Sequence, residues 1–375
     1  LSLKAKGGRE NDIFLDLIQE QITIYVNTGG FMRLKLTLLI LILASFSYLK
    51  PATVSITAVG GGNQAQLDTL AANVNANSPL TKLGNQKDFA KGMGEAAAFS
   101  HNTAATYSYQ NYTLFALMAG YNVGVVTKDI DPDGDMDDAK KKLINEGDVY
   151  AGASANFAFN LGVNITLIKA LLGFDPDNAL YANIKFGKLK TSSDVAGAKI
   201  DNYFFGMGLS YQLIPSFDFV VGSWRGIAIN SGFYMAKQKS EVSLDYASIT
   251  SGGYTLNPSL TVKADSTVYT VPLEATTAFS LFFLNFSAGA GVDFVFGDCG
   301  ADVIVDSDVK DGSNNTVGTV KLNDAKVSGV SPTFMSPKIM FGAGIQIAIL
   351  KIDVPVSYYF KQKAITVGFT AGVVF

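Results

Sequence analysis

The chain has 375 residues, enough for two average domains or one large barrel, and 29 Lys and Arg against 32 Asp and Glu give a formal net charge of −3. That balance provides no basic stripe, so we expect no nucleic-acid partner. The single cysteine, Cys299, excludes an internal disulfide framework and a thiolate metal cluster. Gly (37), Phe (26) and Tyr (16) are prominent, which suits the wall and the aromatic girdles of a β-barrel.

Residues 32–50 have the pattern of a secretory signal peptide. The basic segment Met32–Lys35 precedes the apolar run Leu36–Leu43, and the smaller residues Ala44, Ser45 and Ser47 follow. A membrane anchor is the alternative, but the run is shorter than the roughly 20 apolar residues of a spanning helix. Residues 1–31 precede the signal's own methionine, so we interpret them as an upstream extension from a misplaced start codon and exclude them from the fold.

Residues 51–107 are predicted to form an N-terminal helical or plug segment. We expect a short strand at 53–58 and then helices at 64–75 and 88–101, where Leu, Phe and Ala recur at helical spacing. We interpret them as a periplasmic helical pair or a plug at the mouth of a barrel, with a flexible tether as the alternative. His101, the only histidine, ends the second helix, and we expect a surface or plug residue rather than a catalytic base.

From Tyr112 onward, apolar side chains recur at every second residue, which is the period of a β-strand. Residues 108–375 are therefore predicted to be all-β, as a closed antiparallel transmembrane β-barrel of about ten strands, with eight to twelve left open. The ten strands are expected at 112–126, 149–168, 180–190, 201–213, 224–249, 267–283, 284–297, 338–350, 352–360 and 364–375.

An even number of strands leaves both ends of the wall on the periplasmic side, so alternate connections must share one end of the barrel. The long polar connections 127–148, 250–266 and 298–337 fall together on one side, which we take as the outside. Cys299 is then expected in an external loop as an unpaired thiol. Tight turns are expected at Leu284-Asn285 and Leu350-Lys351 on the periplasmic side, where the apolar phase flips without a loop.

The two faces of the predicted strands differ in chemistry. The outward faces carry no charge, as a hydrocarbon-facing wall requires. The inward faces carry amides and one lysine, which we expect to line and fill the lumen because about ten strands enclose little space. These candidate lining residues are Asn156, Asn160, Asn164, Lys185 and Gln212. A shift of phase near Lys237–Lys239 suggests a bulge or loop there.

The last strand, Ala364–Phe375, alternates apolar with small residues and closes on an aromatic carboxy-terminus. This ending is typical of bacterial outer-membrane barrels, so we expect Phe369, Val373 and Phe375 to serve targeting and assembly. The predicted location is the bacterial outer membrane, with its lipids as partners. A soluble edge strand is the alternative, but such an edge usually carries a charge, and this one carries none.

The chemical motifs are sparse. Asp129, Asp131, Asp133 and Asp135 match the first half of a calcium loop, but Lys140 stands where the bidentate glutamate belongs. We therefore weigh a weak external calcium site against a solvated acidic loop, and favour the loop. The chain contains neither G-x-S-x-G nor H-E-x-x-H, and with one histidine it offers little for nucleophilic catalysis, so we expect no enzyme and no cofactor.

Four short runs carry a resemblance to a known family: Leu83–Gly92, Tyr107–Tyr112, Gly147–Gly152 and Phe186–Leu189. Over roughly residues 55–375 the chain resembles the leptospiral surface adhesin family of spirochaete outer-membrane proteins. The resemblance implies a surface-exposed barrel that binds host extracellular-matrix or plasma proteins, and it assigns no binding residue. Our hypothesis is adhesin-like binding of host or environmental macromolecules by long external loops. A narrow channel or small-solute transporter is the alternative, and a barrel enzyme is a minor third.

Overall fold

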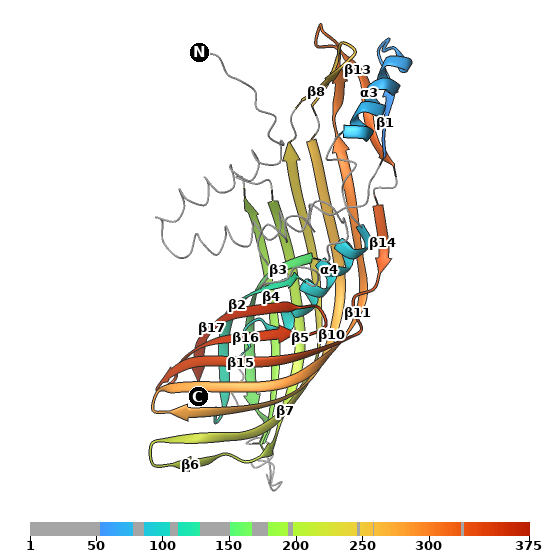
Figure 1. The fold of residues 1–375 in the computed structure, drawn as a ribbon. Coiled ribbons are helices and arrows are strands. Elements are labelled where there is room, and N and C mark those ends of the chain that lie inside the picture. Colours follow the sequence, from blue (N-terminus) through green and yellow to red (C-terminus); the bar gives the residue numbers. More distant parts are fainter. Residues whose placement is uncertain are drawn as a thin grey trace, which may run out of the picture.

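The computed structural model describes residues 53–77, 86–105, 112–127, 151–166, 179–193, 198–245, 248–257, 259–323 and 326–375. Its strands form a large wall and a smaller sheet at one end of that wall (Figure 1). The predicted extension 1–31, the predicted signal peptide 32–50 and the four aspartates Asp129, Asp131, Asp133 and Asp135 lie outside the described residues.

The wall is a closed antiparallel β-barrel of ten strands, which confirms the predicted fold class. Closure comes from two ladders, because the first strand pairs with the last and the fifth wall strand pairs with the sixth. The strands are β2 (Phe115–Thr127), β3 (Ala151–Asn164), β4 (Leu180–Ser193), β5 (Ala198–Ile214), β7 (Gly222–Asp245), β10 (Ser259–Leu281), β11 (Leu284–Asp306), β15 (Met335–Ile347), β16 (Leu350–Tyr359) and β17 (Ala364–Val374). Two short strands, β6 (Phe217–Phe219) and β14 (Lys326–Val330), attach to β7 and β11.

The outer face of the barrel is a belt of exposed apolar side chains. Large exposed hydrophobic residues occur on every wall strand and include Leu117, Phe159, Phe186, Phe205, Phe233, Phe279, Phe286, Phe341, Ile352 and Phe369. Apolar exposure on this scale marks a lipid-facing surface, because a soluble barrel would carry polar groups there. The belt ends abruptly towards one end. On β4, β5 and β7 the outward positions change from Phe186, Phe205 and Met235 to Lys188, Tyr203 and Lys237 one pleat further on.

The periplasmic turns lie two residues earlier than the sequence suggested. β10 and β11 are joined through Phe282-Phe283, and β15 and β16 through Ala348-Ile349. Phe282 and Ala348 both have φ of 53°, a conformation usually supplied by Asn or Gly in such hairpins. These turns lie at the edge of the apolar belt and contain neither Asn nor Gly. The sequence therefore contains no turn signal there, and the predicted turns were placed two residues too late.

The predicted bulge or loop near Lys237–Lys239 is wrong. β7 runs unbroken through these residues, in register with β5 on one side and with β10 on the other. The shift of apolar phase has a different cause. Here the strand leaves the membrane, so its outward lysines meet solvent. The interior at this level is filled by apolar wall residues such as Ile200, Val262 and Val303.

The connections predicted as long loops at 250–266 and 298–337 are largely strands. β10 and β11 extend together well past the belt, from Thr267 and Asp298 to Ser259 and Asp306. Beyond them stands a five-stranded sheet in the order β1-β13-β12-β9-β8 (Figure 1). Its strands are β1 (Thr53–Ala58), β13 (Thr316–Asn323), β12 (Asp308–Lys310), β9 (Tyr254–Leu256) and β8 (Ile249–Ser251). Cys299 accordingly lies buried within β11 and not in a loop.

Helix α3 (Gln64–Asn77) packs on this external sheet, and its Leu67, Leu70 and Val74 are fully buried. Two of its side chains also bind the edge of β1. The Asn75 amide bonds both backbone groups of Val54, and Gln64 bonds the carbonyl of Ile56 and the N–H of Ala58. The helix therefore satisfies the outer edge of β1, which carries no charge to discourage pairing with another chain.

Helix α4 (Gln86–Ala98) and the 3-10 turn η3 (Phe99–Asn102) lie inside the barrel. α4 contacts β3, β10 and β11, and η3 contacts wall strands on several sides. The helix fits because small residues face it. A Cβ on Gly152 would lie 2.0 Å from the Gly92 carbonyl oxygen, and one on Gly94 would lie 1.9 Å from Cys299 Sγ. We call α4 and η3 together the plug. Among the described residues, no helix is long and apolar enough to cross a membrane.

The pairing between β3 and β4 is short and irregular. β3 pairs with β4 only between Phe159 and Asn164, and above this its backbone crosses the inner face of β4. A Cβ on Gly187 of β4 would lie 1.9 Å from the Phe157 carbonyl oxygen, so only glycine permits the crossing. Ala153 and Ala155 have the same alternation phase as the exposed Phe159 and Leu161, but they are buried, because this half of β3 turns into the barrel.

Candidate functional site

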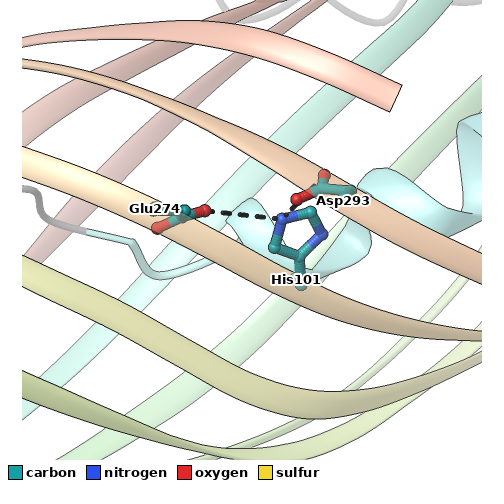
Figure 2. A group of neighbouring side chains, drawn as sticks. All are labelled: His101, Glu274 and Asp293. Atoms are coloured by element: carbon teal, nitrogen blue, oxygen red, sulfur yellow. Dashed lines mark ion pairs between the residues drawn. The ribbon is translucent and has the colours of Figure 1, made fainter. Parts of the chain in front are cut away.

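A cluster of charged side chains joins the plug to the wall at mid-barrel (Figure 2). His101 comes from η3, Glu274 from β10, Asp293 from β11 and Lys338 from β15. The Lys338 ammonium lies 2.5 Å from Glu274 Oε1, 2.8 Å from Asp293 Oδ1 and 2.9 Å from His101 Nε2. Its side chain is fully buried, and a buried ion of this kind persists only when its partners surround it.

The hydrogen bonds fix the tautomer of His101. Its Nδ1 lies 2.9 Å from the carbonyl oxygen of Ala98, which can only accept, so Nδ1 carries the hydrogen. Nε2 then accepts from the ammonium of Lys338 at 2.9 Å, and Asp293 Oδ2 lies 3.2 Å from the same nitrogen. His101 belongs to the plug and not to a spanning strand, and burial, followed by Lys338, lowers its pKa well below the usual value, although Glu274 opposes this shift. The ring is therefore neutral at pH 7.

A second layer of hydrogen bonds surrounds the cluster. Tyr359 donates to Asp293 Oδ2 at 2.9 Å, and Asn102 of η3 donates to the Tyr359 hydroxyl at 2.8 Å. On the opposite wall, Lys185 donates to the carbonyl oxygen of His101 at 2.8 Å. The two lysines balance the two carboxylates, and five wall strands are tied to the last two residues of η3, His101 and Asn102, in one network. Such a network immobilises the plug.

The cluster has the composition of a metal site but already contains a cation. His101 Nε2, Glu274 and Asp293 offer three ligand atoms within 4.8 Å of one another. The ammonium of Lys338 lies between them, at hydrogen-bond distance from each. Both ring nitrogens of His101 are engaged, and the side chain is only 4% exposed. As arranged, the cluster is a structural ion network.

The structure places the predicted lining residues along the inner wall. Asn156 accepts from Ser100 of the plug at 2.8 Å, and Asn160 donates to Ala104 at 3.1 Å. Lys185, described above, also reaches the plug. Asn164 and Gln212 lie nearer the periplasmic end, where Asn164 donates to the Tyr112 carbonyl at 3.5 Å and Gln212 to the Arg225 carbonyl at 3.1 Å.

The residues predicted for targeting lie on the last strand and just beyond it. Phe369 is exposed in the belt, and Val373 pairs with Leu117 and Leu350 of the neighbouring strands. The ring of Phe375 stacks on Phe115 at 4.7 Å between centroids, and its backbone exchanges hydrogen bonds with Leu114 and Phe115. The carboxy-terminus is therefore built into the seam that closes the barrel.

Sequence reasoning missed Glu274, Asp293, Lys338 and Tyr359, and it did not connect His101 to them. A signal was present, because Glu274 lies between Leu273 and Ala275, and Asp293 between Val292 and Phe294. A charge on the inward phase of a membrane strand needs a partner inside the lumen. The identity of that partner depended on the position of the plug, which the alternation of the strands does not report.

A closed barrel with a lipid-facing belt, short apolar turns at one end and an extension at the other defines an outer-membrane β-barrel protein. The predicted location is thereby confirmed. The chain belongs to the Lsa36-like family, whose model matches residues 52–375.

Solved outer-membrane barrels resemble the chain at low sequence identity. The transport unit of the autotransporter AIDA-I from Escherichia coli is 11% identical, covers 76% of this chain and 99% of its own, and gives a TM-score of 0.26. The NalP translocator domain from Neisseria meningitidis is 11% identical, covers 70% and 88%, and gives 0.27. LpxR from Salmonella typhimurium is 13% identical, covers 68% and 100%, and gives 0.22. No curated protein sequence matches significantly.

Proposed function

We propose that the protein is a surface-exposed barrel that binds host or environmental macromolecules through its external extension. The main supporting observation is that the lumen and the external end of the barrel differ in structure. The lumen holds a helix locked by a buried ion network, while β7, β10 and β11 continue outward to carry a separate sheet with its own apolar core. Membership of the Lsa36-like family supports a surface role.

The plug argues against a general pore. α4 packs against the wall with no room for a Cβ at Gly152 or Gly94, and the charged cluster ties η3 to the wall beneath it. Transport would require the plug to leave or tilt, which breaks several buried charge-assisted contacts together. The engaged nitrogens of His101 likewise support a role without catalysis. We therefore favour binding over the alternative of a narrow channel or small-solute transporter.

The test uses the purified protein in detergent with immobilised laminin and plasma fibronectin as probes. A matched variant replaces residues 308–323, which contain β12 and β13, by a short Gly-Ser linker and leaves the barrel wall unchanged. We expect saturable binding by the native protein and at least tenfold weaker binding by the variant, with heat-modifiable gel migration retained by both. Planar-bilayer recording is the second arm. Steady single-channel steps from the native protein, together with no probe binding, would favour transport.

A further inference from the structure

Among the described residues, three lysines lie buried on the inner wall, and their surroundings differ. Lys338 has three polar atoms within 2.9 Å, and Lys185 donates to a carbonyl oxygen at 2.8 Å. Lys351, on β16, is only 1% exposed, yet its one ionic partner, Asp353 Oδ2, lies 3.8 Å away. Among the described residues, no group accepts a hydrogen bond from the Lys351 ammonium. Leaving a buried ammonium without acceptors is costly.

Lys351 belongs to an arc of polar side chains around the periplasmic end of the lumen. Arg225 of β7 donates from Nε to Ser280 Oγ at 3.2 Å, and Ser280 of β10 donates to Asn285 Oδ1 at 2.5 Å. Asn285 of β11 shares an inward row with Gly344 of β15 and Asp353 of β16. A Cβ on Gly344 would lie 2.1 Å from Asp353 Oδ1, so the carboxylate leans across the glycine towards Asn285.

The donors of this arc exceed its acceptors. Because Asn285 Oδ1 accepts from Ser280, its Nδ2 is free to donate, and that buried atom has no hydrogen-bond partner among the described residues. Among the described residues, the terminal nitrogens of Arg225 make no hydrogen bond, and only its Nε does. Two carboxylates face the arc. Asp353 interacts with Lys351, and Asp218, on the exposed strand β6, interacts electrostatically with Arg225 without an ion pair within 4.0 Å in the described residues.

We propose that this arc is a binding site for a phosphate-class anion, reached from the periplasm. An ammonium, a guanidinium and a primary amide are all donors to the oxygens of a tetrahedral anion. The charges of Lys351 and Arg225 are close enough to act on each other, so one anion between them would neutralise both. The plug lies above the arc, so the periplasmic mouth is the route of entry. The anion comes either from solution or from the headgroup of an inner-leaflet lipid. This site is independent of the external extension.

The test measures one-site binding of inorganic phosphate to the full-length protein in a phosphate-free, non-ionic detergent, by calorimetry. We expect saturable binding with the native protein and at least tenfold weaker binding with Lys351→Met. Arg225→Gln, at a half-buried position, gives an independent second variant if Lys351→Met fails to show heat-modifiable migration. Lys199→Met is the matched control, because Lys199 pairs with Glu241 on the external part of the barrel, and it should leave binding unchanged.

A competition experiment identifies the source of the anion. Short-chain phosphatidylglycerol, below its critical micelle concentration, competes with inorganic phosphate for the site. If that lipid displaces phosphate, the site takes a lipid headgroup. If phosphate binds and the lipid does not compete, the site takes a free anion. Absence of saturable binding for either probe, in protein whose barrel is folded, would mean that water alone solvates the arc and would overturn the proposal.

Discussion

Charged side chains in the lumen stabilise one another, so removing one of them leaves its partners unpaired. Lys338 lies between Glu274 and Asp293, and no other ammonium approaches both within 4.0 Å in the described residues. Lys338→Met keeps the volume but leaves the buried Asp293 and the largely buried Glu274 without their cation, which costs about 3–5 kcal/mol. We expect that loss in urea unfolding followed by the fluorescence of Trp224, the single tryptophan.

The control for this prediction is Lys199→Met. Lys199 also forms an ion pair, with Glu241 at 3.0 Å, but its side chain is 65% exposed. Exposed pairs contribute roughly 0–1 kcal/mol, so this variant should unfold at nearly the native urea concentration. Equal effects of the two substitutions would show that the mid-barrel cluster is hydrated and does not hold the plug.

His101 should make stability depend on pH. Its pKa is lowered in the folded protein by burial and by Lys338, so the unfolded chain binds a proton more readily than the folded one. The stabilisation is complete above the unfolded pKa of about 6.5 and is lost as the pH falls below it, by up to about 1.4 kcal/mol at pH 5.5. We expect the native protein to lose more stability than His101→Gln between pH 7.5 and 5.5. An identical pH profile for both would contradict the buried neutral ring.

Residue identity alone revealed only part of this site. Alternation was enough to assign Asn156 and Lys185 to the inner wall, because a lipid-facing amide or ammonium is excluded by its cost. It did not assign Asp293 or Lys338 to a shared cluster, since those positions are brought together by closure of the barrel around η3. The position of η3 depends on the fit of small residues such as Gly152 against the helix backbone. No local pattern in the sequence encodes that fit.

The sequence predicted the strands and helices better than it predicted how they pack together. The ten wall strands follow from period-two apolarity, and the helices from Ala-rich segments with helical spacing. The errors lie where an element passes between environments. At Lys237–Lys239 the same strand passes from lipid to solvent, and its apolar side chains change from the outer to the inner face. We interpreted the whole strand as one membrane segment and therefore predicted a bulge that is absent.

The packing of α4 against β3 supplies a prediction at this scale. A side chain at Gly152 would collide with the backbone of the plug at Gly92 and Met93, 2.0 and 2.7 Å from the new Cβ. Gly152→Val should therefore displace α4 or cost about 1–3 kcal/mol of stability. We expect new conductance in planar bilayers or a lower unfolding midpoint. Gly312→Val is the control, because nothing lies within 4 Å of its Cβ. A Gly152→Val variant with native conductance and a native unfolding midpoint would contradict the packing of α4 against β3.

At the scale of the molecule, the parity of the connections fixes its orientation in the membrane. The hairpin turns at Phe282-Phe283 and Ala348-Ile349 share one end with the carboxy-terminus, and the five-stranded sheet stands at the other. Short turns and the wall ends face the periplasm in outer-membrane barrels, so the sheet faces outward. An epitope inserted between Gly312 and Ser313 should be labelled on intact cells. One inserted between Pro215 and Ser216 should be labelled only after permeabilisation.

The path of the N-terminal segment yields a stricter test. β1 completes the external sheet by pairing with β13, α4 then lies in the lumen, and β2 begins at the periplasmic end, where Leu114 bonds Phe375. The described chain therefore passes from the outside through the barrel to the periplasm before it enters the wall. An epitope placed directly before Thr53 should be accessible to antibody and to protease on intact cells.

The control for this prediction is an epitope after Phe375, which should be protected in the same cells. The physical reason is that β1 and α3 share one apolar core with β13 and β9, so the segment cannot stay in the periplasm while the sheet forms outside. Protection of the N-terminal epitope together with exposure of the Gly312–Ser313 epitope would mean that β1 does not pair with β13 in the cell. In that event the plug would enter the lumen from the periplasmic side.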